Sequence, residues 1–157
     1  MDEATLYFRI DRLFADYCAC LDEDELERWP ELFTADGDYR MISRENHDAG
    51  HPIPLLWLAG RGMMADRIYS LRNANIYAAN RYRHAQSAVR VLGEENGEYR
   101  VSSSYIVVQT LHDAFSEVYQ AGAYYDRVVL DDGQLRFRER LVVYDTARVK
   151  TLLAAPV

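Results

Sequence analysis

The sequence predicts an α+β fold, in which a curved sheet of long strands carries helices on one face. Two patterns point to this class. Up to Ala74 apolar side chains recur mostly at helical spacing, whereas after Asn80 the chain is a series of β-branched and aromatic runs separated by turn signals. No repeat, low-complexity tract or linker divides the sequence, so residues 1–157 are expected to form a single domain.

Three helices are expected in the first half of the chain. An amphipathic helix is predicted from about Ala4 to Leu21, because its apolar residues follow the helical period. A shorter helix should follow the acidic run DEDE, with Pro30 interrupting or restarting it. The segment GRGMMADRIYSLRNA returns to helical spacing. The apolar residues that define these stripes are Leu6, Ile10, Leu13, Phe14, Tyr17 and Leu21, then Leu26, Trp29 and Phe33, then Met64, Ile68 and Leu71.

Strands are expected on both sides of the third helix. The stretch TADGDYR is predicted as a turn that feeds a strand, RENHDAGHPIP as a loop, and LLWLA as a short apolar strand. Later strands are predicted near residues 81–92, 99–112, 115–130 and 134–145, separated by GEENGE, HDA and DDG. Asp132-Gly133, between two such runs, is a strong hairpin signal.

The charge balance limits the partners. The formal net charge is −7 and the arginines are interleaved with acids, so a nucleic-acid partner is disfavoured. No apolar run is long enough to span a bilayer, which argues against a membrane partner. The start MDEATLYFRIDRLF is acidic and amphipathic, unlike a secretory signal. A cytoplasmic location is therefore expected.

The two cysteines, Cys18 and Cys20, are expected to be small packing residues. On a helix this spacing points the side chains to nearly opposite sides, so they are poor disulfide partners. The sequence has no Cys-x-x-Cys pair, and zinc or iron–sulfur sites built on such pairs are therefore absent.

Three of the four histidines give weak signals. His47 and His51 are four residues apart, but Gly50 and Pro52 disfavour the helix that would turn this spacing into a metal site. His112 precedes an aspartate in a predicted hairpin turn and is expected to face solvent. No metal site is predicted in this chain.

His84 is the histidine best placed for chemistry. As a general base near neutral pH it would be oriented by Asp38 or Asp16 and helped by Tyr17 or Tyr105. Alternatively, it is hydrogen-bonded in place or faces a partner chain. Both interpretations rest on strand alternation in NRYRHAQSAVRV, which predicts Tyr82, His84 and Gln86 on one face, lining a cavity if that face is concave, and Ala85, Val89 and Val91 on the other.

Tyrosines and arginines indicate a ligand surface or an interface. The chain has 12 tyrosines, with Tyr124 and Tyr125 adjacent, and tyrosine suits both carbohydrate or aromatic ligands and buried interfaces. On the last strand Arg136, Arg138 and Arg140 are predicted to share one face, where they would form ion pairs with another subunit or face solvent. Glu139 is predicted on the opposite face with Leu135, Phe137, Leu141 and Val143, needing a partner if it is buried.

Five segments in order, WPELFTADGDYRM, GMMADRIYSLR, RYRHAQSAVRV, AGAYYDRVV and GQLRFRERLVVYD, resemble the small (β) subunit of aromatic ring-hydroxylating dioxygenases. The resemblance runs from the first helix to Asp145. The short loops and ANIYAANRYRH are most similar to the branch serving aromatic acids such as terephthalate, salicylate or anthranilate.

The resemblance implies a nuclear transport factor 2-like (cystatin-like) cone, a strongly curved mixed sheet wrapped around the N-terminal helices. It also implies an assembly of three α and three β subunits built on a β trimer. The α subunit would carry a Rieske [2Fe-2S] cluster and a mononuclear Fe(II), for which this chain has no ligand set. No catalytic, cofactor or metal residue is then expected here, and Arg83, His84, Tyr124, Tyr125, Arg136, Arg138 and Arg140 would have structural or interface roles.

Many members of this family carry Asn four residues after the histidine, where this chain has Ala88. Loss of that polar group weakens a catalytic role for His84. The sequence thus favours a mainly structural subunit of a multicomponent oxygenase in aromatic catabolism, whose electrons come from NAD(P)H. The alternatives are a stand-alone lyase or isomerase with His84 as base, and a small-ligand-binding module without chemistry.

Overall fold

The computed structural model describes residues 1–73, 80–111, 115–146 and 156–157 and confirms the α+β class. Helices and strands follow the order expected from the sequence, with the helices concentrated before Asn80. The helices are α1 (Glu3–Asp22), the 3-10 helix η1 (Leu26–Leu32), α2 (Arg44–Asp48) and α3 (Gly60–Asn73), and the strands are β1 (Phe33–Ser43), β2 (Leu56–Ala59), β3 (Asn80–Glu95), β4 (Glu98–Leu111), β5 (Ser116–Asp131) and β6 (Gln134–Tyr144).

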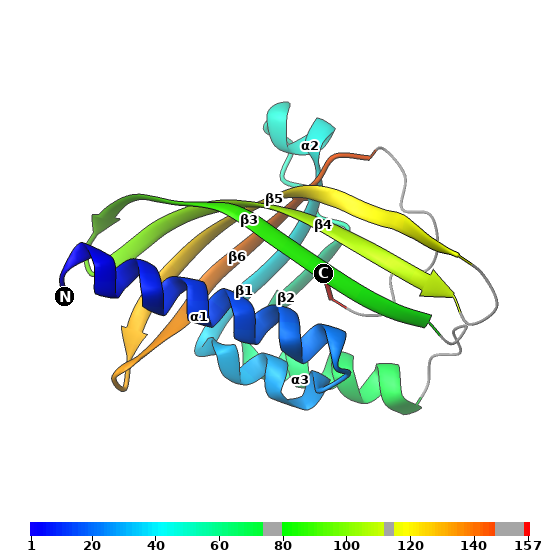
Figure 1. Ribbon diagram of the computed structural model, residues 1–157, viewed down its shortest axis with the longest axis horizontal. Coiled ribbons are helices and arrows are strands. Elements are labelled where there is room, and N and C mark those ends of the chain that lie inside the picture. Colours follow the sequence, from blue (N-terminus) through cyan, green and yellow to red (C-terminus); the bar gives the residue numbers. More distant parts are fainter. Residues whose placement is uncertain (74–79, 112–114, 147–155) are drawn as a thin grey trace.

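The strands form one mixed sheet in the order β2-β1-β6-β5-β4-β3. β1 runs parallel to β6, and all other neighbours are antiparallel. In Figure 1 the sheet curves over α1 and α3, which lie together on one side, while the short α2 lies on the other. The face toward α1 and α3 is called the inner face below, and the face toward α2 the outer face.

The first helix fills the concave side of the sheet. Asp2 caps its N-terminus by accepting a hydrogen bond from the Thr5 backbone N–H at 2.9 Å. The apolar stripe predicted from the sequence is buried against the sheet, with Ile10 and Tyr17 fully enclosed. Burying such a stripe supplies most of the stability of an amphipathic helix, so α1 and the sheet depend on each other.

The turn chemistry also acts as predicted. Asp132 and Gly133 have φ values of 47° and 77°, the left-handed conformation that a tight two-residue hairpin turn requires at both central positions. They join β5 to β6, with Asp131 opposite Gln134. The loop predicted over RENHDAGHPIP is partly wrong, because its start forms α2, capped by the Ser43 side chain and ending before Gly50.

A bulge in β3 changes which residues face inward. The pairing with β4 shifts between Ser87 and Arg90, and Ala88 in that gap has a φ of 53°. One extra residue reverses the alternation of all side chains that follow it. Val89 and Val91 therefore pack against the core, on the same face as Tyr82, His84 and Gln86, and not on the opposite face as predicted.

A second bulge lies between β5 and β6. There the register shifts between Arg127, opposite Glu139, and Val128, opposite Phe137. Arg140 consequently faces inward and is completely buried, whereas Glu139 lies on the outer face. The prediction that Arg136, Arg138 and Arg140 share a face is wrong for Arg140, because the period-two pattern is interrupted at this bulge.

Among the described residues, no helix has both the length and the apolar character needed to cross a membrane.

Candidate functional site

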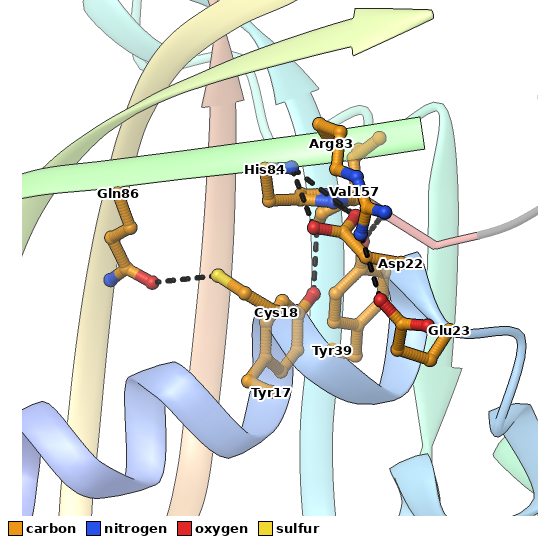
Figure 2. A network of polar contacts seen from close by, with 9 residues as sticks. All are labelled: Tyr17, Cys18, Asp22, Glu23, Tyr39, Arg83, His84, Gln86 and Val157. Atoms are coloured by element: carbon orange, nitrogen blue, oxygen red, sulfur yellow. Dashed lines mark hydrogen bonds and ion pairs between the residues drawn. The ribbon is translucent and has the colours of Figure 1, made fainter. Parts of the chain in front are cut away.

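His84 lies on β3, on the inner face of the sheet, and its side chain is 1% exposed. Its partner is Asp22, the last residue of α1. The Nδ1 atom lies 2.6 Å from one Asp22 carboxylate oxygen, and the His84 backbone N–H donates to the other oxygen at 2.9 Å. Figure 2 shows both contacts at the junction of helix and strand. One carboxylate thus fixes both the ring and the main chain of His84.

The protonation of the ring follows from this contact. An ionised carboxylate only accepts hydrogen bonds, so Nδ1 carries the proton in the neutral ring and Nε2 keeps its lone pair. Nε2 is buried and has no hydrogen-bond partner among the described residues. The His84–Asp22 pair therefore presents an oriented basic nitrogen to the interior, the arrangement from which general-base chemistry starts.

The neighbouring side chains are polar but not reactive. Gln86 donates from Nε2 to Ser103 Oγ at 2.7 Å, and its Oε1 lies 3.8 Å from Cys18 Sγ. Burial raises the pKa of the Cys18 thiol to about 11, so it stays protonated near neutral pH. Both cysteines are free thiols. A half-open cavity of about 260 Å³ borders this region between α1 and β3, lined by Asp11, Phe14, Ala15, Cys18, His84, Ala85, Gln86 and Val89.

The acids predicted to orient His84 do not approach it. Asp38 accepts from Trp57 Nε1 at 2.6 Å and pairs with Arg40 at 3.0 Å, while Asp16 pairs with Arg12 at 3.4 Å on the exposed side of α1. Asp22 performs that function instead. It was overlooked because it belongs to the acidic run at the end of the first helix, which the sequence pattern presents as the solvated start of the next helix.

The predicted helper tyrosines lie deeper in the interior. Tyr105 donates to Gln120 Oε1 at 2.8 Å, and Tyr17 donates to the backbone oxygen of Val157 at 2.6 Å. Burial raises the pKa of Tyr17 to about 12 and that of Tyr105 further still. Both are neutral hydrogen-bond donors near pH 7, and each donates to a partner other than His84.

Arg140 forms the second buried polar contact of the interior. Its guanidinium makes two hydrogen bonds of 2.9 Å to the carboxylate of Asp126, and both side chains are 0% exposed. Burial alone would lower the pKa of Arg140, but the Asp126 carboxylate raises it above its ordinary value, so the cation is retained. Four rings lie within 5.0 Å of the guanidinium carbon, those of Phe14, Tyr17, Tyr124 and Phe137.

The other predicted structural or interface residues lie on the outer surface and have partners within the chain. Arg83 pairs with Glu23 at 2.8 Å, next to the His84–Asp22 contact. Arg136 pairs with Asp131 at 3.1 Å and Arg138 with Asp36 at 2.6 Å. Glu139 has the arginine partners that its burial requires, Arg40 and Arg127. Tyr125 is 37% exposed and stacks on His47, with ring centroids 5.5 Å apart.

His47 and His51 do not form a metal site with their described neighbours. His47 lies on α2 beside Asp48, and His51 is exposed just beyond Gly50. His112 lies outside the described residues. Within the described ranges, no group of three or more His, Cys, Asp or Glu side chains is placed to hold a metal ion.

A curved mixed sheet wrapped around an N-terminal helix, with buried polar contacts in an apolar interior, defines the structural class of this chain. Comparison with known proteins then gives the family. The model for the ring hydroxylating beta subunit matches residues 18–151, and this chain belongs to that family. It is therefore an oxygenase subunit of an oxidoreductase complex, and subunits of this kind pair with α subunits.

Two relatives and two solved structures illustrate the similarity. The chain is 44% identical to the anthranilate 1,2-dioxygenase small subunit of Burkholderia cepacia, over 99% of this chain and 97% of the relative. It is 35% identical to the terephthalate 1,2-dioxygenase terminal oxygenase component subunit beta 2 of Comamonas sp., over 90% of this chain and 92% of the relative.

A crystal structure described as a ring-hydroxylating dioxygenase β subunit, from Novosphingobium aromaticivorans, superposes with a TM-score of 0.90 at 39% identity, covering 99% of this chain and all of that one. ActVI-ORFA from Streptomyces coelicolor, at 19% identity, shares the fold alone, with a TM-score of 0.73 over 90% of this chain and 98% of the other. These similarities confirm the nuclear transport factor 2-like cone expected from the sequence.

Proposed function

We propose that this chain is the β subunit of an oxygenase that acts on an aromatic carboxylic acid in the cytoplasm, and that it supports a catalytic α subunit without chemistry of its own. The observation that carries this proposal is the similarity over nearly the full length to a subunit named for anthranilate, an aromatic carboxylate. The second relative is named for terephthalate, which belongs to the same chemical class.

The proposed α subunit carries the Rieske [2Fe-2S] cluster and a mononuclear Fe(II). Electrons from NAD(P)H pass through a reductase to the cluster and then to the iron that activates oxygen, all outside this chain. The proposal is consistent with the side chains found here, since the described residues hold no three-ligand group and the buried Cys18 thiol is kept protonated. In this proposal the β chain helps to assemble and stabilise the complex with the α subunit.

The proposed assembly is three α and three β subunits built on a β trimer. The outer face of the sheet supports an interface, because it exposes apolar side chains that α2 does not cover. Ile106 and Leu92 are each 46% exposed there, and Leu92 lines a surface hollow together with Tyr125. Arg127 and Arg138 of this face are paired within the chain, so we expect apolar contact to supply most of the binding free energy.

Native mass measurement of the chain alone and together with a Rieske-type large subunit tests the proposal. We expect an oligomer, colourless and iron-free when purified alone, that forms a larger complex with the large subunit. Ile106→Glu should lower the native mass, because a charge cannot be buried at an apolar contact. Tyr69→Glu is the matched control, since Tyr69 is 71% exposed on α3, on the inner side of the sheet. A brown, iron-loaded protein, or no complex with any such subunit, contradicts the proposal.

A stand-alone lyase or isomerase is the second candidate, and the geometry of His84 and Asp22 is the observation that favours it. Against it stand the family membership and the inert surroundings of the ring. Under this candidate His84→Ala would abolish turnover of a small hydroxylated or keto substrate in the absence of any α subunit. Under the proposal above, the purified chain has no such activity to lose.

A further inference from the structure

Val157 is buried in the interior although it is remote in sequence from everything it contacts. Its exposed fraction is 2%, and Pro156 before it is also buried. The backbone oxygen of Val157 accepts hydrogen bonds from the hydroxyls of Tyr17, at 2.6 Å, and Tyr39, at 2.9 Å. Its backbone N–H donates to the Tyr39 hydroxyl at 3.1 Å. One residue therefore satisfies two hydroxyls that are themselves fully enclosed.

Two phenol groups that donate to one oxygen form a recognition element of definite chemistry. The acceptor must offer two lone pairs in one place, as a carbonyl or carboxylate oxygen does. Tyr17 comes from α1 and Tyr39 from β1, so the packing of helix on sheet sets the spacing of the two hydroxyls independently of Val157. Burial raises the pKa of both, which keeps them as donors.

The surroundings of Tyr17 and Tyr39 also contain a buried polar atom without a hydrogen-bond partner among the described residues, Nε2 of His84. Figure 2 shows Tyr17 and Tyr39 directed toward Val157, in the part of the interior that also holds the His84–Asp22 contact. Buried polar atoms are almost always hydrogen-bonded, so this His84 nitrogen offers one more contact to a polar ligand that the two hydroxyls hold.

We propose that the interior beneath β3 is a binding site for a small carbonyl or carboxylate compound, and that Pro156-Val157 occupies it as an intramolecular ligand. Tyr17 and Tyr39 bind the ligand oxygen, and the apolar wall that holds the Val157 side chain receives a branched aliphatic group or a ring. Pro156 suits this task because it carries no backbone N–H that would need a partner in the interior. The site is closed while Val157 remains in place and opens when a competitor displaces it.

A chain that stops at Ala155 tests the proposal directly. The probes are N-acetyl-prolyl-valine, which copies the internal ligand, and the pair isovalerate and isovaleramide, which distinguish a carboxylate from a neutral carbonyl. We expect the shortened chain to melt at a lower temperature and to be restabilised by the peptide and by at least one small probe. Because a tethered ligand competes at an effective concentration in the millimolar range, the intact chain should bind each probe about tenfold more weakly or worse.

Phenylalanine substitutions establish where the probe binds. In the shortened chain, Tyr17→Phe and Tyr39→Phe should each reduce probe affinity measured by calorimetry, whereas Tyr125→Phe, on the outer face, should leave it unchanged. If the shortened chain does not fold, Val157→Lys in the full chain replaces it, since a lysine cannot be buried unpaired and must leave the site. A folded shortened or Val157→Lys chain that binds none of the probes, or that melts like the intact chain, overturns the proposal.

These experiments use the β chain alone and are independent of the proposed assembly. Failure of the chain to bind an α subunit would leave the internal site intact, and a shortened chain that binds no probe would still be expected to assemble.

Discussion

The interior contains two buried contacts between a cationic or basic side chain and a carboxylate, and they differ in what surrounds them. Arg140 and Asp126 lie on adjacent strands, are both 0% exposed and share two 2.9 Å hydrogen bonds inside a cage of aromatic rings. His84 and Asp22 join a helix end to a strand, and His84 borders the half-open cavity between α1 and β3. In each contact one nitrogen, Arg140 Nη1 or His84 Nε2, has no hydrogen-bond partner among the described residues.

The different surroundings indicate that the Arg140–Asp126 contact is structural, whereas the His84–Asp22 contact is a candidate functional site. A cation that has lost its water must be paired and packed all round, because leaving it unpaired costs several kcal/mol. Arg140 is paired with Asp126 and packed against aromatic rings, so it belongs to the core. His84 is anchored by Asp22 at Nδ1, and Val157, the proposed internal ligand, lies in the same part of the interior. Both contacts lie beneath the same sheet, and the second borders a cavity.

Removing the cation of the first pair should have the largest effect on stability. We expect Arg140→Met to lower the free energy of unfolding by about 3–5 kcal/mol, because Asp126 is left as an uncompensated buried charge. The double variant Arg140→Met/Asp126→Leu should recover most of this loss. Urea denaturation of the single and double variants provides the measurement. A loss below about 1 kcal/mol for the single variant would show that water reaches Asp126.

Weakening the His84–Asp22 contact should lower the free energy of unfolding by a smaller amount. Asp22→Asn keeps the shape but removes the charge that orients His84, and we expect a loss of about 1.5–3 kcal/mol, typical of hydrogen bonds to charged groups. The control is Glu23→Gln, which breaks the exposed ion pair between Glu23 and Arg83 next to this contact. We expect this variant to lose about 1 kcal/mol of unfolding free energy or less. Nitrogen NMR of the His84 ring should show the proton on Nδ1 in the unmodified chain. Equal losses in the two variants would contradict the anchoring role of Asp22.

Unfolding at alkaline pH tests Tyr17, which contacts both the Arg140 guanidinium and Val157. Burial raises the pKa of Tyr17 from its ordinary value of 10.0 to about 12, so the folded state holds this proton where the unfolded state releases it. The contribution of Tyr17 is complete below pH 10 and is lost as pH rises toward 12, by roughly 3 kcal/mol at about 1.4 kcal/mol per unit. Tyrosinate absorbance and unfolding measured between these pH values check it. Tyr17→Phe should flatten this dependence, and an unchanged slope would contradict the assignment.

The smallest expected effect concerns the bulge that shapes the wall next to His84. Ala88 is exposed and has a φ of 53°, a conformation that costs alanine free energy but suits asparagine and glycine. Ala88→Asn and Ala88→Gly should therefore stabilise the chain by about 0.5–1 kcal/mol in thermal unfolding. Ser87→Gly, one residue earlier, is the control and should not stabilise. A loss of stability in Ala88→Asn would contradict the backbone explanation.

Ala88 also changes how the family pattern is interpreted. The sequence alone predicts that the asparagine usual at this position is a polar group of the pocket, so that its absence weakens a catalytic role for His84. The structure places position 88 on the outer side of a bulge, where asparagine is favoured for its backbone conformation. Its absence therefore carries no information about the chemistry of the ring. The case against catalysis rests on family membership and on the unreactive surroundings of the ring instead.

Several features could be predicted because their causes are local. The stripe that includes Ile10 and Tyr17 has the helical period, and Asp132-Gly133 supplies the backbone conformation that a tight turn demands. The inward direction of His84 followed from alternation, because no bulge lies between it and Tyr82. Each of these inferences spans only a few residues, and tertiary contacts reinforce it.

The sequence by itself thus determined the class of fold, the order of its elements and, through five ordered segments, the family. Only the tertiary structure decided that Asp22 orients His84, that Arg140 lies inside and that Val157 meets Tyr17 and Tyr39. The physical reason is that these contacts join residues between 14 and 140 positions apart and depend on two bulges. A single extra residue in a strand reverses its inner and outer faces, and the side-chain pattern does not record where that residue is inserted.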